Sequence, residues 1–241
     1  YHKLAEKIVF KLDDALAIYK NKSTTYASLK RLEKQGMIKK VRNNLYVIIN
    51  PITKTAFANK YQIGSSITED AYITQISALE YYGYQNQVSN FCYVSSISRF
   101  NSFEFEGVTY KQVSNKIEKG VMRPPYTQLI KISDIEKTVV DAMHKIDAII
   151  NLEELIYSFE LIPSLDEKKI IEYLKTYNIQ ALYQKAGYLL SLVKEKNNFS
   201  ESLFLEIQNK IDKGISYLSE EAKRNGVYIK GIARFNIPPY I

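Results

Sequence analysis

The chain has 241 residues, which is enough for two or three compact units, and its formal net charge is +7. Its single cysteine, Cys92, excludes an intramolecular disulfide framework and argues against a cysteine-based zinc module. No apolar run approaches the roughly 20 residues that a membrane-spanning helix needs, so we expect a soluble, cytoplasmic protein with no membrane partner.

Positive charge is concentrated at the start of the sequence. Residues 1–50 contain 11 Lys and Arg against 4 Asp and Glu, whereas the rest of the chain contains 22 of each kind. Clustered cations bind polyanions because they displace the counterions of the phosphates. A basic stretch by itself is more often a solvated surface, so the local pattern has to decide between these two interpretations.

The first part of this basic region predicts helices. The chain begins with tyrosine rather than methionine, so we expect that the natural start is missing and that residues 1–9 end a longer first helix. Apolar spacing and two early aspartates predict a short helix over residues 12–19. The polar turn "KNKS" follows it. Ser23 or Thr24 can cap the next helix, which should continue to Gly36.

The residues after Gly36 predict a hairpin. The alternation in "MIKKVRNNLYVII" indicates strands over residues 37–41 and 45–49, joined by a tight turn in which Asn tolerates the left-handed conformation. Two helices and a hairpin in this order predict a winged helix-turn-helix domain over residues 1–50. In such a domain the second helix enters the major groove and the hairpin, or wing, lies along the DNA backbone.

The second helix of this region has one apolar and one basic side. Its period places Thr25, Leu29 and Leu32 on the buried side. We expect Lys30 and Arg31 to contact base edges, because their side chains match the acceptors of guanine. The remaining contacts are expected on phosphates, sugars or thymine methyl groups. The predicted DNA-binding residues are Ser23, Thr24, Tyr26, Ala27, Lys30, Arg31, Lys34, Lys39, Lys40, Arg42, Asn43 and Asn44. The alternative is a protein-interaction fold whose basic face is only solvated.

The middle of the chain predicts mixed α and β structure. Residues 51–66 are expected to be a linker or boundary, and residues 67–150 a mixed α/β region. A helix capped by Thr68 should run through Tyr82. The segments "FCYV" and "FEFEGVTYKQV" predict strands, the second turning at Glu106 and Gly107. Ser133 and Glu136 have the spacing of a capping box in front of the apolar face of "IEKTVVDAMHKI".

The last part of the chain predicts helices. Residues 151–241 should form a mainly helical region, with Ser164 and Glu167 as another capping box and an amphipathic run near residues 179–196. The final "VYIKGIARFNIPPYI" is expected to return as a strand and tail. The predicted fold class is therefore α+β, with a winged helix-turn-helix followed by a mixed region and a mainly helical one.

Three segments together resemble the AbiEi antitoxins of bacterial type IV toxin-antitoxin systems, which act in abortive infection and phage defence. They are "RLEKQGMIKKVRNNLYVI", "YITQISALEYYGY" and "ISDIEKTVVDAMHK". The resemblance implies a repressor of its own operon that binds inverted repeats in double-stranded promoter DNA. It also implies a C-terminal portion that counters a nucleotidyltransferase-like toxin without forming a stable complex with it. One departure lies in the wing, where the family commonly has Arg-x-Gly-Leu-Tyr and this chain has Asn44 in place of the glycine.

Some residues fit parts of a catalytic or metal site. His144 is a lone candidate for a general base beside Asp141, and such a histidine is more often structural or exposed. Glu104 and Glu106 alternate along a predicted strand and face one side. They lack a third ligand at suitable spacing, so a metal site is not assigned.

Two further patterns are also incomplete. Residues 167–169, "EKK", match half of a nuclease motif but fall in a predicted helix rather than on a strand. Gly64 and Ser65 are followed by Glu69 and Asp70, whose adjacent side chains diverge instead of forming the paired-carboxylate motif of a nucleotidyltransferase. We therefore predict that the protein is not an enzyme and assign no catalytic residue, metal or cofactor.

Two other function classes remain open beside the repressor and antitoxin. The first is a nucleic-acid-modifying enzyme that a winged helix directs to its substrate. The second is a ligand-responsive winged-helix regulator without a toxin, which would lack a neighbouring nucleotidyltransferase-like gene.

Overall fold

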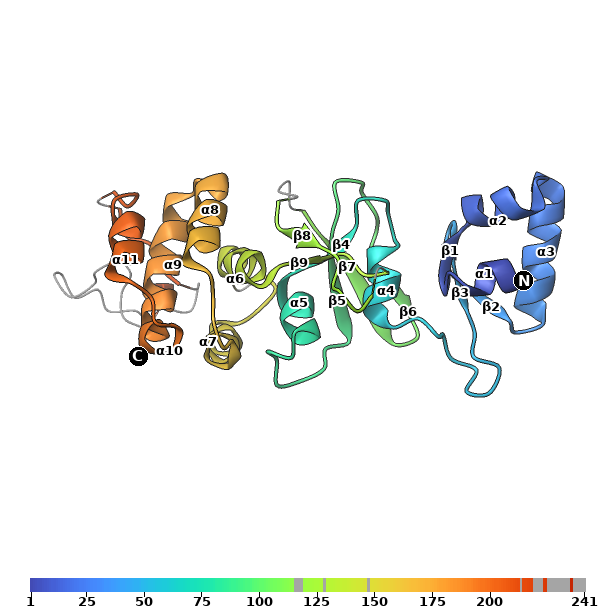
Figure 1. Cartoon of the computed structure of the whole chain (residues 1–241), viewed down its shortest axis with the longest axis horizontal. Coiled ribbons are helices and arrows are strands. Elements are labelled where there is room, and N and C mark those ends of the chain that lie inside the picture. Colours follow the sequence, from blue (N-terminus) through green and yellow to red (C-terminus); the bar gives the residue numbers. More distant parts are fainter. Residues whose placement is uncertain are drawn as a thin grey trace. The chain divides into compact units, whose positions relative to one another are not determined.

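The computed structural model describes residues 1–114, 119–127, 129–146, 148–212, 214–218, 223–224 and 235. In this part of the chain the fold is mixed α+β, with 11 helices and two sheets (Figure 1). No helix within it is long and apolar enough to cross a membrane. The strand and tail expected near the C-terminus lie, apart from Phe235, outside the described residues.

The described chain forms two compact units, and both are discontinuous in sequence. The first unit contains Tyr1–Ile73 and Ser89–Ile132, and the second contains Thr74–Val88 and Ser133–Ile241. The stretch from Thr74 to Val88 therefore packs with residues that follow it by more than forty positions.

A three-stranded antiparallel sheet and three helices open the first unit. The strands lie in the order β1-β3-β2, and Val9 pairs with Val47. The helices pack on the sheet through Leu4, Leu29 and Leu32, all buried. These elements are α1 (His2–Ala5), β1 (Val9–Lys11), α2 (Leu12–Tyr19), α3 (Lys22–Lys34), β2 (Ile38–Arg42) and β3 (Leu45–Ile48).

The expectation that residues 1–9 are all helical is wrong. The helix α1 ends at Ala5, and Ile8 adopts a left-handed conformation with φ of 61°. The chain then enters β1, where Phe10 stacks on Tyr46 of β3 at 5.5 Å between ring centroids. A three-residue strand of this kind has too little alternation to be read from sequence, because its partner lies far along the chain.

A second, six-stranded sheet has the order β6-β7-β5-β4-β9-β8. The helix α4 lies within the range expected to be a linker, and it packs closely on the sheet at Gly64. A Cβ added there would lie 2.7 Å from Ile73 Cδ1 and 3.1 Å from Cys92 Sγ. The elements are α4 (Lys60–Ser65), β4 (Tyr72–Ile73), β5 (Phe91–Ser95), β6 (Phe103–Phe105), β7 (Val108–Val113), β8 (Val121–Met122) and β9 (Ile132–Ser133).

The sequence predicted two of these strand regions and missed the short strands β4, β8 and β9. The strands at "FCYV" and on both sides of Glu106 and Gly107 are confirmed, and both turn residues have positive φ, 48° and 78°. The helix expected from Thr68 through Tyr82 is wrong in its first half, because Tyr72 and Ile73 form β4. A short buried strand followed at once by a helix has no period of its own that separates the two.

The second unit is mainly helical in its described residues, and α6 lies at its centre, in contact with α5, α7, α8 and α9. Leu79, Val139 and Leu174 are fully buried where these helices meet. The helices are α5 (Gln75–Tyr81), α6 (Ile135–His144), α7 (Leu152–Leu161), α8 (Glu167–Tyr177), α9 (Gln180–Leu192), α10 (Lys194–Asn197) and α11 (Glu201–Gln208).

Both capping boxes predicted in this unit are wrong in their capping residue. Asp134 caps α6 by accepting the backbone N–H of Lys137 at 2.8 Å. Asp166 caps α8 in the same way through its first turn. Ser133 belongs to β9 and its hydroxyl lies 2.7 Å from the hydroxyl of Thr138. Aspartate caps as well as serine does, so spacing alone does not choose between neighbours.

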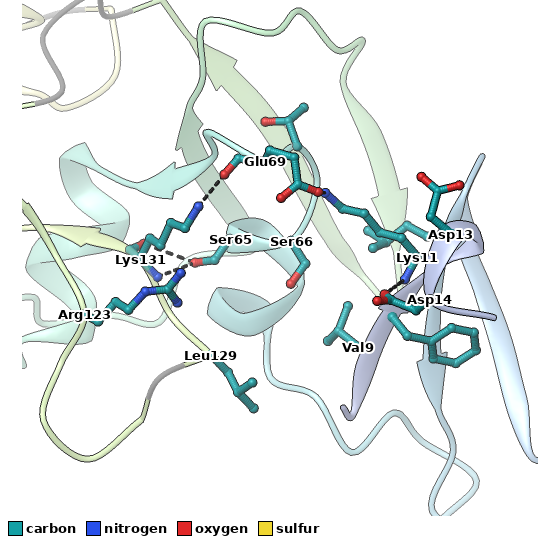
Figure 2. Close-up of a pocket in the computed structure, with 13 residues that line it drawn as sticks. Val9, Lys11, Asp13, Asp14, Ser65, Ser66, Glu69, Arg123, Leu129 and Lys131 are labelled. Atoms are coloured by element: carbon teal, nitrogen blue, oxygen red, sulfur yellow. Dashed lines mark hydrogen bonds and ion pairs between the residues drawn. The ribbon is translucent and has the colours of Figure 1, made fainter. Parts of the chain in front are cut away.

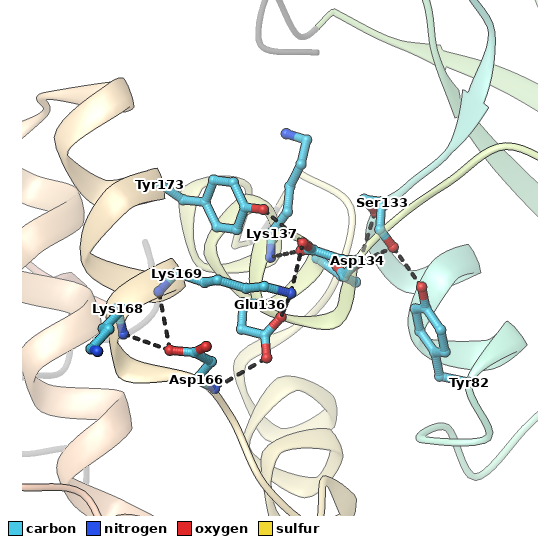
Figure 3. Close-up of polar contacts among 10 residues, drawn as sticks. Tyr82, Ser133, Asp134, Glu136, Lys137, Asp166, Lys168, Lys169 and Tyr173 are labelled. Carbon is cyan, nitrogen blue, oxygen red and sulfur yellow. Dashed lines mark hydrogen bonds and ion pairs between the residues drawn. The ribbon is translucent and has the colours of Figure 1, made fainter. Parts of the chain in front are cut away.

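The caps of α6 and α8 are joined by polar contacts (Figure 3). Lys169 Nζ lies 3.4 Å from a carboxylate oxygen of Asp134 and 3.3 Å from one of Glu136. The Tyr173 hydroxyl donates to Asp134 at 2.7 Å. Burial, together with this carboxylate, raises the pKa of Tyr173, so the tyrosine remains a hydrogen-bond donor. These contacts connect the start of α6 with α8.

A buried ion pair lies within α6. Lys137 Nζ lies 3.0 Å from Asp141 Oδ2, and the two side chains are 1% and 0% exposed. Thr74 donates to the same carboxylate at 3.2 Å, and the Tyr177 hydroxyl donates to it at 2.5 Å. Burial raises the pKa of Asp141, while Lys137 opposes that effect. The pair therefore connects the residue before α5 with the end of α8.

We predict that Asp141→Ala lowers the free energy of unfolding of the second unit by about 3 to 5 kcal/mol, because it removes the carboxylate that pairs with the buried Lys137 ammonium at 3.0 Å. Urea denaturation followed by circular dichroism measures this loss. The double variant Lys137→Met with Asp141→Leu removes both charges and should lose less. A loss of less than about 1 kcal/mol in Asp141→Ala would contradict the burial of the pair.

Candidate nucleic-acid interface

The helix α3 begins and ends at well-defined residues. Asn21 caps it, accepting the backbone N–H of Thr24 at 3.0 Å. The expectation that Ser23 or Thr24 is the cap is therefore wrong, since both lie in the first helical turn. The predicted end is confirmed: Gly36 has φ of 68°, and the N–H of Met37 reaches back to the carbonyl of Leu32 at 3.0 Å.

The apolar spacing of α3 correctly predicts which of its residues are buried and which are exposed. Thr25, Leu29 and Leu32 are buried against α2 and the three-stranded sheet. The opposite side faces solvent, and the Tyr26 side chain is 47% exposed there. The exposed residues of the predicted set on this helix are Ser23, Thr24, Tyr26, Ala27, Lys30, Arg31 and Lys34.

The cations on this exposed side are not neutralised by ion pairs within the part of the chain that the structure describes. Lys30, Arg31 and Lys34 form no ion pair with any residue that the structure describes. Lys40, on β2, is likewise exposed and makes no ion pair within the described chain. Unneutralised cations that share a surface are the groups that displace counterions from a polyanion.

The hairpin after α3 is present as predicted. Its strands are joined by Asn43 and Asn44, and Arg42 pairs with Leu45 across the turn. Asn44 has φ of 63°, the left-handed conformation that the predicted tight turn requires. Both asparagines are exposed, and so is Lys40.

Two predicted wing contacts are already occupied by protein groups of the same unit. The Arg42 guanidinium lies 5.1 Å from the ring centre of Phe103 and 5.5 Å from that of Phe100, and burial lowers its pKa. Lys39 Nζ lies 3.1 Å from Glu106 Oε1. Sequence reasoning missed these contacts because the partners lie some sixty positions further along the chain.

A cavity of about 300 Å³ lies in the same unit (Figure 2). Glu69 receives the Lys11 ammonium at its carboxylate and the Lys131 ammonium at its backbone carbonyl. Ser65 Oγ donates to the carbonyl of Lys131 at 3.1 Å. Figure 2 shows Arg123 beside these groups. Cations and carboxylates both line the cavity, so it has no single charge preference.

The nucleotidyltransferase-like pattern does not assemble. Asp70 accepts backbone N–H groups of Ile97 and of Ser98, the latter at 3.0 Å. Burial opposes their effect, yet these hydrogen bonds lower the pKa of Asp70 well below its usual range. Glu69 instead turns to Lys11. The two adjacent carboxylates therefore diverge, as predicted.

The other candidate catalytic residues are also separate. His144 lies against Tyr177, 5.2 Å between ring centroids, and burial lowers its pKa. Glu104 is exposed, while Glu106 is engaged by Lys39. Glu167 accepts the Ser200 hydroxyl at 2.7 Å. Within the described residues, no group of three or more His, Cys, Asp or Glu is placed to hold a metal ion.

No protein-family model matches the chain, and no curated protein matches it. A solved structure of similar fold is that of the RV2827C protein from Mycobacterium tuberculosis. The TM-score is 0.64 with 12% sequence identity, and the match covers 95% of this chain and 85% of that one. At this identity the likeness shows the fold alone.

We predict that Asn21→Ala increases hydrogen exchange of the first-turn amides of α3 about five-fold. This corresponds to the roughly 1 kcal/mol that an N-terminal cap contributes. Hydrogen exchange followed by mass spectrometry or NMR measures this. Ser23→Ala is the matched control and should leave the exchange rate nearly unchanged. An equal effect of the two substitutions would show that Asn21 is not the cap.

Proposed function

We propose that this protein is a DNA-binding autorepressor and antitoxin of a type IV toxin-antitoxin system. On this proposal, its first part is a winged helix-turn-helix that binds inverted repeats in its own promoter. The observation that carries the DNA-binding proposal is the exposed side of α3, with three cations that make no ion pair in the described chain. The element order α1-β1-α2-α3-β2-β3 supports it, because a winged helix has this arrangement.

The dimensions of α3 suit the major groove. Its 13 residues span about 20 Å, and the groove of B-DNA admits an α-helix. Lys30 and Arg31 lie on the exposed side and are the proposed readers of base edges. Lys40, Asn43 and Asn44 lie exposed on the hairpin and are proposed to contact the phosphate backbone.

The antitoxin half of the proposal concerns the second unit. The parts of "YITQISALEYYGY" and "ISDIEKTVVDAMHK" that begin at Thr74 and Ser133 pack together there as α5 on α6. Thr74 contacts Asp141, and the Tyr82 hydroxyl donates to the carbonyl of Ser133 at 2.8 Å. The contacts between two segments that resemble the same family support a common role for them. We propose that this unit counters a nucleotidyltransferase-like toxin without a stable complex, with no catalysis and no cofactor, in the cytoplasm.

A ligand-responsive regulator without a toxin is the second candidate function. The observation in its favour is the cavity beside Lys11 and Glu69, which is large enough for a small molecule. This candidate requires that operator affinity change when a small molecule binds. It also requires that no nucleotidyltransferase-like gene neighbour the gene for this chain.

We predict that the double variant Lys30→Ala with Arg31→Ala loses sequence-specific binding to duplex DNA from its own promoter. Both side chains are exposed, so the fold should remain. Mobility shift at physiological salt, with a shuffled duplex of equal length as competitor, measures the loss.

The matched control for this experiment is Lys196→Ala with Lys210→Ala. Both lysines are exposed and belong to the second unit. Replacing them with alanine removes the same amount of positive charge as the Lys30 and Arg31 variant. This control should bind the promoter duplex as the unaltered protein does. Retained specific binding by the Lys30 and Arg31 variant would reject α3 as the reading helix, and equal binding to both duplexes by the unaltered protein would reject operator recognition.

We predict that co-expression of the chain with the product of a neighbouring nucleotidyltransferase-like gene relieves the growth arrest that this product causes. The Lys30 and Arg31 variant should still relieve it, because the proposed toxin-countering unit is separate from α3. Colony counts under induced toxin expression, with repression of the native promoter bypassed, measure relief. Failure of the unaltered chain to relieve the arrest would reject the antitoxin role without touching the DNA-binding proposal.

A further inference from the structure

The β6–β7 hairpin, residues Phe103 to Val113, contacts two cations of strand β2. Strand β2 belongs to the β2–β3 hairpin, which is the proposed wing. Glu106, in its turn, binds the Lys39 ammonium with one carboxylate oxygen and the backbone N–H of Ala56 with the other, at 3.1 Å and 3.2 Å. Lys39 also lies 5.1 Å from the ring centre of Phe105. The hairpin thus presents a carboxylate to the wing where bound DNA would present a phosphate.

Arg42 is held by the same region, but one nitrogen of its guanidinium has no hydrogen-bond partner among the described residues. Its guanidinium lies over the rings of Phe100 and Phe103, and its Nη1 atom is buried without a hydrogen-bond partner in the described structure. Aromatic faces attract a guanidinium but cannot accept its N–H groups as a phosphate does. A phosphate would therefore satisfy Arg42 better than its present partners do.

We infer that the β6–β7 hairpin competes intramolecularly with DNA phosphates for Lys39 and Arg42, and so limits the number of wing cations that bind DNA. This inference rests on the proposed DNA-binding function and states how that site is regulated. With the hairpin in place, DNA meets Lys30, Arg31, Lys34 and Lys40. Release of the hairpin adds Lys39 and Arg42.

The ion pair between the hairpin and Lys39 is weak enough to open and close reversibly, so the β6–β7 hairpin can act as a reversible mask over Lys39 and Arg42. The side chains of Lys39 and Glu106 are 52% and 26% exposed, and ion pairs at such exposure are weak and sensitive to salt. The apparent affinity of the DNA-bound state that uses Lys39 and Arg42 is its intrinsic affinity multiplied by the fraction of molecules in which the hairpin has released them. Any event that moves the hairpin therefore changes operator occupancy without altering α3.

The test compares two glutamates of one hairpin. Glu106→Gln removes the charge that holds Lys39, and Glu104→Gln removes the same charge from an exposed position without a described ion pair. Operator affinity is measured by fluorescence anisotropy over a series of salt concentrations. We expect Glu106→Gln to bind more tightly, with a salt slope steeper by about 0.9, the value for one added phosphate contact. Glu104→Gln should leave the slope unchanged.

Adding Lys39→Ala to the unaltered protein and to Glu106→Gln tests whether Lys39 is the cation that gains the extra phosphate contact. Lys39→Ala should change the slope little when Glu106 is present. In the Glu106→Gln background it should cancel the whole gain. Equal effects of Glu104→Gln and Glu106→Gln would overturn the inference, since general repulsion of DNA would then explain both. A weaker slope in Glu106→Gln would also overturn it, because Glu106 would then position Lys39 for DNA.

A second readout does not require DNA. Acetylation of lysine amines by N-hydroxysuccinimide acetate, mapped by mass spectrometry, reports how accessible Lys39 is relative to its exposed neighbour Lys40. The ratio should rise in Glu106→Gln and stay constant in Glu104→Gln. An unchanged ratio rejects the mask itself, whereas a raised ratio in a protein that binds no duplex rejects the proposed function alone.

Discussion

The ion pair of Lys137 and Asp141 is the interaction on which the second unit depends. Both charges are withdrawn from water, so each is tolerated only while the other and its hydrogen-bond partners are present. Two of those partners, Thr74 and Tyr177, come from the residue before α5 and the end of α8. The register of α6 against both helices is therefore fixed by polar geometry, and the apolar contacts at Val139 and Leu174 add stability to an arrangement already specified.

Local features were predictable from the sequence, and features that depend on distant partners were not. The buried side of α3, the stop at Gly36 and the turn at Glu106 and Gly107 are encoded within a few residues, by helical period or by tolerance of positive φ. The strand β4 was missed because its hydrogen bonds go to segments far along the chain. Three of the four predicted helix caps were misplaced by one to three residues, since Asn, Asp, Ser and Thr stand close together at these helix starts and any of them can cap. The fourth, Thr68, lies six residues before Thr74, the residue at which α5 is observed to begin.

The candidate interface shows the same division. Periodicity and charge counting identify which residues of α3 face solvent, because that depends on the helix and its own core. They do not identify which cations are engaged elsewhere. Lys39 and Arg42 are as basic in sequence as Lys40, yet Glu106, Phe100 and Phe103 distinguish them through contacts across some sixty positions. Composition therefore sets an upper limit on the charge available to a partner, and tertiary contacts decide how much of that charge is free.

The path of the chain between the units has a consequence for how such a protein can be divided or recombined. The chain leaves the first unit after Ile73, returns at Ser89 and leaves again after Ile132. A fragment that starts at Ser133 would lack α5 and the Thr74 hydroxyl, and it would expose the apolar side of α6 that α5 covers. No single splice or proteolytic cut separates the two units intact. During evolution, exchange of the second unit for another would therefore require three coordinated junctions, after Ile73, Val88 and Ile132, which favours inheritance of both units as one piece.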